Sequence, residues 1–314
     1  MKNQYVIDLI QDYLQYVEIE KGRALNTVRN YELYLNRFYE LASEDLEYEM
    51  LPSDIDDEML RKFRLRLNRL EVDERGTRLT AVTQAYYLIA LRGFLKYLAR
   101  RKIPSLDPSL VDLPRTHRPQ VTFLHIDEVQ AMLDQIDLST EIGLRDRAII
   151  ELLFAGGLRV SELCALNRDD INLTRREFVV RGKGSKDRPI FIDESAAGRV
   201  KDYLAARHDS LPALFLNNSR NSGATSTSGD YRRLTPRSIQ RIVEKYTRAA
   251  GITKHVTPHT LRHSFATDLL MNGADLRSVQ SLLGHSNIST TQIYTHITDT
   301  HLKDVHKRFH SGTS

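Results

Sequence analysis

One stretch near the C-terminus concentrates side chains that could act on a phosphate group. The segment 257–265 places His259 and Arg262 three positions apart, so both lie on one face of a predicted helix. His285 and Tyr294 follow downstream. Histidines can move protons, an arginine fork can bind phosphate oxygens, and an activated phenol can attack phosphorus. The pattern predicts a reaction on a phosphate in which Tyr294 is the nucleophile.

Two further basic residues fall earlier in the chain, each beside glycines. Arg159 follows Gly156-Gly157, which allow a tight turn before a helix, and Lys183 lies in the tip 182–187. Breaking a phosphodiester without a metal needs cations for the non-bridging oxygens, an acid for the leaving oxygen and activation of the tyrosine. These two residues and the downstream group offer a candidate for each need.

Each residue taken alone also fits a plain structural role. Arg159 fits a surface residue at a helix end, and Lys183 fits an exposed turn lysine. His263 and His285 fit structural histidines, and Tyr294, one of 14 tyrosines, fits a packing position. Only the combination of these residues indicates phosphate chemistry.

A metal-dependent nuclease is the competing hypothesis for the histidines. His255, His259 and His263 recur at intervals of four, but the clustered carboxylates of hard-cation sites are lacking. The single cysteine, Cys164, excludes an intramolecular disulfide and a cysteine-rich zinc site, and its apolar surroundings predict a core position. The tip 182–187 lacks the spacing of a nucleotide-binding loop. We therefore expect neither a metal nor a cofactor.

The elements that must position these residues fall into two domains. We assign 1–103 to a helical domain, 104–120 to an extended, basic, proline-containing linker, and 121–314 to a second domain. Helical spacing and capping signals in the first domain predict helices over 4–20, from Asn26 or Thr27, from Ser53 or Asp54, and from Thr80 into the basic run 96–102.

The second domain is predicted to be helical apart from one hairpin. Alternating residues predict strands over 177–181 and 188–192 on either side of the tip. The predicted helices cover 127–136, 143–154, 160–166, 194–207, 235–250, 258–271, 275–283, 289–297 and 299–310. The expected fold class is therefore mainly α with a small β-sheet in the C-terminal domain. A polar run over 217–230 is predicted to be a mobile loop.

The overall charge permits a polyanionic partner. The chain holds 45 Lys and Arg against 41 Asp and Glu, a formal net charge of +4. The N-terminal residues form an amphipathic pattern rather than a signal peptide, and no apolar run reaches the ~20 residues of a membrane span. We expect a cytoplasmic protein with no membrane partner.

Five segments in order resemble the tyrosine recombinases, also called the phage-integrase family, and in particular the Xer branch. They are GGLRVSEL, GKGSKDRPI, LTPRSIQRIV, TPHTLRHSFATDLL and LLGHSNISTTQIYTHI. The resemblance covers the whole chain, whose first third is similar to the helical, SAM-like DNA-clamping domain of that family. It implies a two-domain, C-shaped clamp. The polar run 217–230 departs from the pattern, since it looks longer than the corresponding Xer loop.

The resemblance implies a role for each candidate. The catalytic positions of the family fall on Arg159, Lys183, His259, Arg262, His285 and Tyr294. By resemblance, Tyr294 forms a 3′-phosphotyrosyl link, two arginines and His285 stabilise the transition state, Lys183 protonates the 5′ oxygen, and His259 assists as acid or base. Strand exchange then passes through a Holliday junction without ATP or metal.

The resemblance also implies an assembly on double-stranded DNA. Family members act as a tetramer on two sites, alone or with a paralogue, and a regulatory protein can take part. The helix 299–310 has Leu302, Val305 and Phe309 on one side and is expected to dock into the next protomer. The implied role is resolution of chromosome or plasmid dimers. A mobile-element integrase or transposase and a non-catalytic DNA-binding protein on the same fold remain alternatives.

Basic and polar residues outside the catalytic set are candidate phosphate contacts. They are Thr27, Arg29, Arg92 and Lys96 in the first domain, and Arg181, Lys186, Arg188, Arg237 and Arg241 in the second. A solvated helix face is the alternative for each of them.

Overall fold

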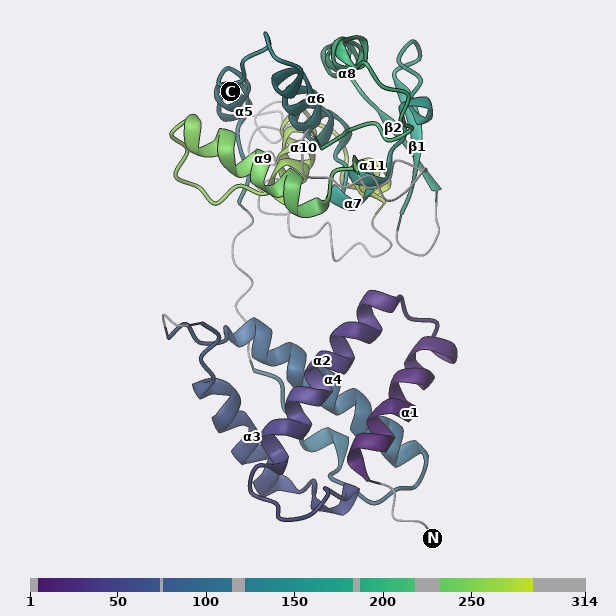
Figure 1. The fold of residues 1–314 in the computed structure, drawn as a ribbon, viewed down its shortest axis with the longest axis vertical. Coiled ribbons are helices and arrows are strands. Elements are labelled where there is room, and N and C mark those ends of the chain that lie inside the picture. The colour runs from purple at the N-terminus through teal and green to yellow at the C-terminus, as the bar shows by residue number, and fades with distance from the viewer. Residues whose placement is uncertain (1–4, 74–75, 115–121, 183–186, 218–231, 285–314) are drawn as a thin grey trace, which may run out of the picture. The chain divides into compact units, whose positions relative to one another are not determined.

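The computed structural model of the chain describes residues 5–73, 76–114, 122–182, 187–217 and 232–284. The chain divides into two compact units, Met1–Pro119 and Gln120–Ser314, each with a hydrophobic core of its own (Figure 1). The mainly helical fold class with a small antiparallel sheet in the second unit, predicted from the sequence, is confirmed. None of the helices in the described ranges is long and apolar enough to cross a membrane.

The described residues of the first unit form a bundle of four α-helices with two short 3-10 helices. Its elements are α1 (Val6–Ile19), α2 (Leu25–Ser43), the short 3-10 helix η1 (Pro52–Asp54), α3 (Asp57–Arg69), α4 (Ala81–Arg100) and the 3-10 helix η2 (Pro108–Leu110). Helix α2 packs against α1, α3 and α4. Phe38 of α2 meets Phe63 of α3 edge to face at 5.0 Å, and both are buried with Phe94 of α4. These rings lie in a core of aliphatic and aromatic side chains from all four helices, whose burial holds the bundle together.

Two helix starts in this unit differ from the sequence prediction. Helix α2 begins at Leu25, because the Ala24 carbonyl accepts the first backbone hydrogen bonds without help from a side chain. Helix α3 begins at Asp57, and its N-cap is Asp56 rather than Ser53 or Asp54. The Asp54 carboxylate instead accepts from the Leu51 backbone N–H at 2.8 Å within η1. The predicted Thr80 cap of α4 is confirmed, since its hydroxyl accepts from the Thr83 backbone N–H.

The second unit builds its core around one buried helix. Its elements are α5 (Ile126–Leu133), α6 (Glu141–Gly156), α7 (Val160–Ala165), the 3-10 helix η3 (Arg168–Asp170), β1 (Glu177–Arg181), β2 (Asp187–Phe191), α8 (Glu194–Ala206), α9 (Pro236–Ala249), α10 (Pro258–Met271) and α11 (Leu276–Leu283). Helix α6 packs against α8, α9, α10 and β2. Its side chains Ile149, Leu152 and Leu153 are fully buried. Helix α5 ends at Leu133, three residues before the predicted end.

The two strands form the predicted hairpin. They pair antiparallel, with Phe178 opposite Ile190 and Val180 opposite Arg188. These four side chains are buried and alternate with exposed ones, as a sheet with one covered face requires. Arg188 is therefore a cation in the row of side chains that faces the core.

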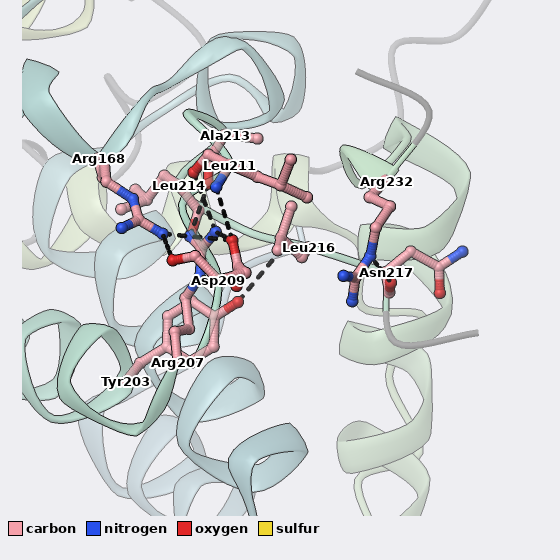
Figure 2. A network of polar contacts seen from close by, with 10 residues as sticks. All are labelled: Arg168, Tyr203, Arg207, Asp209, Leu211, Ala213, Leu214, Leu216, Asn217 and Arg232. Atoms are coloured by element: carbon pink, nitrogen blue, oxygen red, sulfur yellow. Dashed lines mark hydrogen bonds and ion pairs between the residues drawn. The ribbon is translucent and has the colours of Figure 1, made fainter. Parts of the chain in front are cut away.

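A buried arginine organises the segment that follows α8. The Arg207 guanidinium is fully buried and donates to the Asp209 carboxylate at 2.6 Å and to the carbonyls of Ala213 and Leu214 (Figure 2). Farther on, the Asn217 backbone N–H donates to the Arg232 carbonyl at 2.7 Å. This bond joins the two described residues on either side of the segment 218–231, which itself lies outside the described residues, as does most of the predicted loop.

Candidate functional site

A tight glycine turn carries Arg159 to its place at the start of α7. Gly157 ends α6 in the left-handed conformation, with φ of +54°, and a Cβ there would lie 2.3 Å from a ring carbon of Phe265. Glycine is therefore required twice over, by the backbone and by the neighbouring ring. Arg159 follows as the N-cap of α7, so the turn delivers its side chain to the junction of α7, α10 and α11.

Helix α10 supplies the His-x-x-Arg pair in the predicted way. Thr257 is its N-cap, accepting from the Thr260 backbone N–H, and Pro258 occupies the first helical position. His259 lies at the surface, whereas Arg262 is only 2% exposed. The Arg262 guanidinium donates to the carbonyl of Gly157, which ties α10 to the turn before Arg159.

Three arginines meet at the C-terminal end of α11. The carbonyls of its last turn, at 282, 283 and 284, accept from Arg188, Arg262 and Arg159 respectively. The first two contacts are short, while the Arg159 Nη2 lies 3.4 Å from its carbonyl. The C-terminus of a helix carries partial negative charge, so cations are favoured there. The arrangement brings guanidiniums from α7, β2 and α10 to one place.

The carboxylate of Glu162 binds this cluster from the other side. It accepts from the Arg159 backbone N–H at 2.8 Å, from the Arg159 Nη1 at 2.6 Å and from the Arg188 Nη2 at 2.7 Å, and it lies 4.0 Å from Arg262. Burial alone would raise the pKa of Glu162, but these donors and charges outweigh it and the pKa is lowered. One carboxylate thus faces three guanidiniums, which leaves a surplus of positive charge.

The positive charge of the arginines also affects the pKa of His259. Its pKa is lowered, first because the surrounding protein removes water from the ring, and then because Arg262 and Arg159 disfavour a further cation. The lowered pKa favours the neutral imidazole of His259 over the charged form. Its ring contacts that of His263 at 4.3 Å between centroids. A neutral histidine can accept a proton from an attacking group, and the two arginines beside it can bind an anion.

The structure therefore brings Arg159, His259 and Arg262 together, as the sequence led us to expect. Lys183, His285 and Tyr294 lie outside the described residues, and so do Lys186 and the predicted helices 289–297 and 299–310. The described chain continues directly into two of these residues. In the sequence, Lys183 comes directly after Gly182, which follows the last residue of β1, and His285 comes directly after Gly284, the C-cap of α11.

The candidate DNA contacts divide by exposure. Arg29, Lys96, Arg181, Arg237 and Arg241 are exposed, and Thr27 and Arg92 are half-buried. Arg188 does not fit this set: it is 6% exposed, and its guanidinium is held by Glu162 and the end of α11. The sequence assigned it to DNA because it sits in a basic hairpin, but the period of the strand turns it inward.

Sequence reasoning also missed Glu162. A signal was present, since the run from Arg159 to Glu162 has the three-residue spacing of a capping box, which the structure forms at the start of α7. Cys164 was expected in the core, and it is half-buried against the core of this unit. Burial raises the pKa of its thiol to about 11, so it is a poor nucleophile at neutral pH.

Within the described ranges, no three His, Cys, Asp or Glu side chains gather to hold a metal ion. The hollow beside Glu162, lined by α7 and the hairpin, has a volume of about 440 Å³ and is open to solvent. Its lining includes the carboxylates of Glu162, Asp170 and Asp187 beside Arg181, so this hollow is not the cationic face of the cluster.

Comparison with known proteins agrees with this geometry. The profile of the phage integrase family matches residues 122–301, and that of the phage integrase N-terminal SAM-like domain matches residues 10–102. The tyrosine recombinase XerC of Myxococcus xanthus is 38% identical over 303 residues, covering 96% of this chain and 97% of that protein. The tyrosine recombinase XerD of Listeria monocytogenes is 38% identical over 305 residues, covering 96% and 98%.

A solved structure extends the likeness to the fold. The XerH site-specific recombinase, bound to its palindromic difH substrate in a post-cleavage complex, matches with a TM-score of 0.69 and 25% identity over 94% of this chain and 82% of that one. The profile spans more than half of the chain, and the XerC and XerD relatives match nearly its whole length. The chain therefore belongs to the phage integrase family and is a tyrosine-type site-specific recombinase.

Proposed function

We propose that this recombinase cuts and rejoins double-stranded DNA through a bond between Tyr294 and a 3′ phosphate. The Tyr294 oxygen attacks the scissile phosphorus and gives its proton to His259. The bond from phosphorus to the 5′ oxygen breaks, and that oxygen takes a proton from Lys183. A 5′ hydroxyl of the partner strand then reverses the step. Because the phosphotyrosyl ester conserves the bond energy, the reaction needs neither ATP nor a metal ion.

The observation that carries the proposal is the convergence of the half-buried Arg159, the buried Arg262 and the exposed His259 at one end of α11 and α10. Attack on a phosphodiester concentrates negative charge on the non-bridging oxygens. Guanidinium groups fixed beforehand stabilise that charge without reorganising during the reaction. Relatives named as tyrosine recombinases, and a structure of XerH after cleavage of its DNA, support the same chemistry.

The contacts of Arg159 suggest how a phosphate is received. One side of its fork is held by Glu162 at 2.6 Å, whereas the other reaches the Gly284 carbonyl only at 3.4 Å, and the side chain remains 31% exposed. This distance is longer than the range of about 2.7–3.2 Å that is usual for N–H···O hydrogen bonds, so the contact is weak. The outer side of the fork can therefore exchange a carbonyl for a phosphate oxygen, while Glu162 keeps the guanidinium in place.

Charged pairs on two helices support DNA binding by each unit. Arg92 and Lys96 are four positions apart on α4, and Arg237 and Arg241 are four apart on α9, so each pair shares a helix face. Such rows follow a phosphate backbone, and their binding depends steeply on salt concentration. Neighbours in the solved structures, such as the XerH complex, are bound to DNA.

We further propose a tetramer on two DNA sites, formed with copies of this chain or with a paralogue and open to a regulatory partner. The helix 299–310 would dock into the next protomer, and head-to-tail docking of this kind closes into a ring. The Xer names of the relatives favour resolution of chromosome or plasmid dimers, acting on DNA in the cytoplasm, over movement of a genetic element.

One assay tests the chemistry. The full chain is incubated with a nicked suicide substrate in the presence of EDTA, and the products are separated on a denaturing gel. We expect a covalent protein–DNA species that is absent from Tyr294→Phe and retained in Tyr48→Phe, a matched change at an exposed tyrosine of the first unit. Cleavage that needs a metal and leaves no adduct, or binding without cleavage, would refute the proposal.

A further inference from the structure

The buried arginine of the hairpin lies where three elements of the site meet. From β2, the Arg188 Nη2 donates to Glu162 of α7 at 2.7 Å, and its Nη1 donates to the Leu282 carbonyl at the end of α11. Arg159 and Arg262 use the same carboxylate and the next two carbonyls of the same helix end. Arg188 is thus the third member of a set whose other two members are proposed to bind the phosphate.

We propose that Arg188 is a positioning residue for strand cleavage. It fixes the Glu162 carboxylate and the last turn of α11, and through them it holds the Arg159 and Arg262 guanidiniums at the separation that a phosphodiester needs. This inference rests on the proposed function. Arg188 itself is 6% exposed and acts through its neighbours rather than on the DNA.

Stability alone does not account for a cation at this place. Replacing a buried ion pair by well-packed apolar residues is often neutral or stabilising. Moreover, no acceptor for the Arg188 Nε is found among the described residues, although this atom is buried. Arg207 is the contrast: its Nε and both terminal nitrogens donate to Asp209 and to backbone carbonyls (Figure 2). Arg207 therefore has the full set of partners expected of a structural arginine, whereas the buried guanidinium of Arg188 has an acceptor for Nη1 and Nη2 but none for Nε among the described residues.

The end of α11 is shaped around Arg188. Gly284 has φ of +61°, and a Cβ there would lie 2.6 Å from the Arg188 Cδ. A residue with a side chain at this position would push Arg188 away from Leu282 or unwind the turn that accepts from the arginines. The contact can therefore be disturbed from either partner, by changing Arg188 or by changing Gly284.

The test compares two substrates that differ in charge. One carries the normal scissile phosphate, and the other a methylphosphonate, whose methyl group replaces a charged oxygen. Misplaced guanidiniums should slow cleavage of the charged phosphate much more than cleavage of the neutral analogue. For Arg188→Lys, we expect single-site DNA binding to change little and cleavage of the phosphate to slow by about 100-fold. The ratio of the phosphate rate to the methylphosphonate rate should fall at least tenfold.

Arg207→Lys is the matched control, because it changes a buried, ion-paired arginine away from the cluster. It should lower thermal stability while leaving the ratio of the two rates at the wild-type value. Gly284→Ala should lower the ratio as Arg188→Lys does, and it replaces that variant in the test if Arg188→Lys does not fold. The proposal is overturned if the folded variant cleaves phosphate within twofold of the wild-type rate, or if it loses both rates equally. An absence of cleavage by the wild-type protein would instead refute the proposed function.

Discussion

Glu162 is the point at which a single change of charge should have the largest effect on the second unit. It is buried and accepts from the Arg159 backbone N–H, the Arg159 guanidinium and the Arg188 guanidinium at 2.6–2.8 Å. Glu162→Gln keeps the shape of the side chain but removes its charge. It also brings an amide N–H group that can point at the guanidiniums. Three buried or half-buried cations would then lose their shared counter-charge.

The size of the effect follows from the burial of the pair. Removing one partner of a buried ion pair costs about 3–5 kcal/mol, because the remaining charge is left without compensation. For a unit of this size, each kcal/mol lowers Tm by about 2–4 °C. The expected fall in Tm is therefore about 6–20 °C at pH 7.

The effect should also depend on pH. The pKa of Glu162 is lowered in the folded protein, so its contribution to the free energy of unfolding is complete above the ordinary carboxyl value of about 4.3. That contribution is lost as the pH falls below this value, towards the folded pKa. The difference in stability between wild type and Glu162→Gln should accordingly be constant between pH 6 and 8 and shrink below about pH 4.3.

The assay is thermal unfolding followed by circular dichroism, with cleavage measured on the same preparations. Glu151→Gln is the matched control, since Glu151 is equally buried and bonded to Arg147 and Ser195, away from the three arginines. Both variants should be destabilised, but only Glu162→Gln should lose cleavage in molecules that remain folded and bound to DNA. A Glu162→Gln protein with wild-type Tm and cleavage would show that the carboxylate does not hold the cluster.

Three other results are expected. Gly157→Ala should destabilise the protein by about 1–3 kcal/mol, because both the positive φ of Gly157 and the Phe265 ring beside it oppose a side chain. The control is Gly198→Ala, which adds a methyl group in open space on α8 and should not destabilise the protein. Denaturant unfolding of both variants checks this. On acidification, the rate of adduct formation should fall with a midpoint below the ordinary histidine value of about 6.5, because the pKa of His259 is lowered; a midpoint at or above about 6.5 in single-turnover assays contradicts this expectation. Replacing both Arg92 and Lys96 by Gln should reduce the slope of log affinity against log salt concentration by about 2, which DNA titrations at several salt concentrations would measure. An unchanged slope would show that neither residue contacts a phosphate.

Local signals in the sequence were sufficient to predict a helix start or a turn where only one residue type suits the position. Thr257-Pro258 marks the start of α10 because a hydroxyl cap and a proline at the first position both suit a helix N-terminus. The glycine turn before Arg159 and the alternation in the hairpin are similar cases. They determine the neighbourhood of Arg159, His259 and Arg262, and so three of the predicted site residues could be brought together from sequence alone.

Local signals did not predict the helix start correctly where several neighbouring residues could serve as the N-cap, or where none does. In the segment 53–57, four residues of helix-capping type compete, and the backbone selects Asp56 because Asp54 is already used within η1. At Ala24 the helix starts without any side-chain cap, so there was no signal to find. The free energy that decides these starts comes from the packing of α2 against α1, α3 and α4, which single-residue preferences do not contain.

The misassignment of Arg188 has a different origin, and it bears on how such sites arise. A basic residue in a basic hairpin is indistinguishable, by type, from a phosphate contact. Its role depends on the strand period, which turns it inward, and on Glu162, which lies 26 positions earlier in the chain. Neither partner is informative alone, because a buried arginine is costly without the carboxylate and the buried carboxylate is costly without its cations. Arg159 and Arg262 already outweigh the charge of Glu162, so Arg188 adds a further positive charge and a further bond to the carboxylate that orders the other two arginines. A surplus of positive charge is what binding an anionic diester requires.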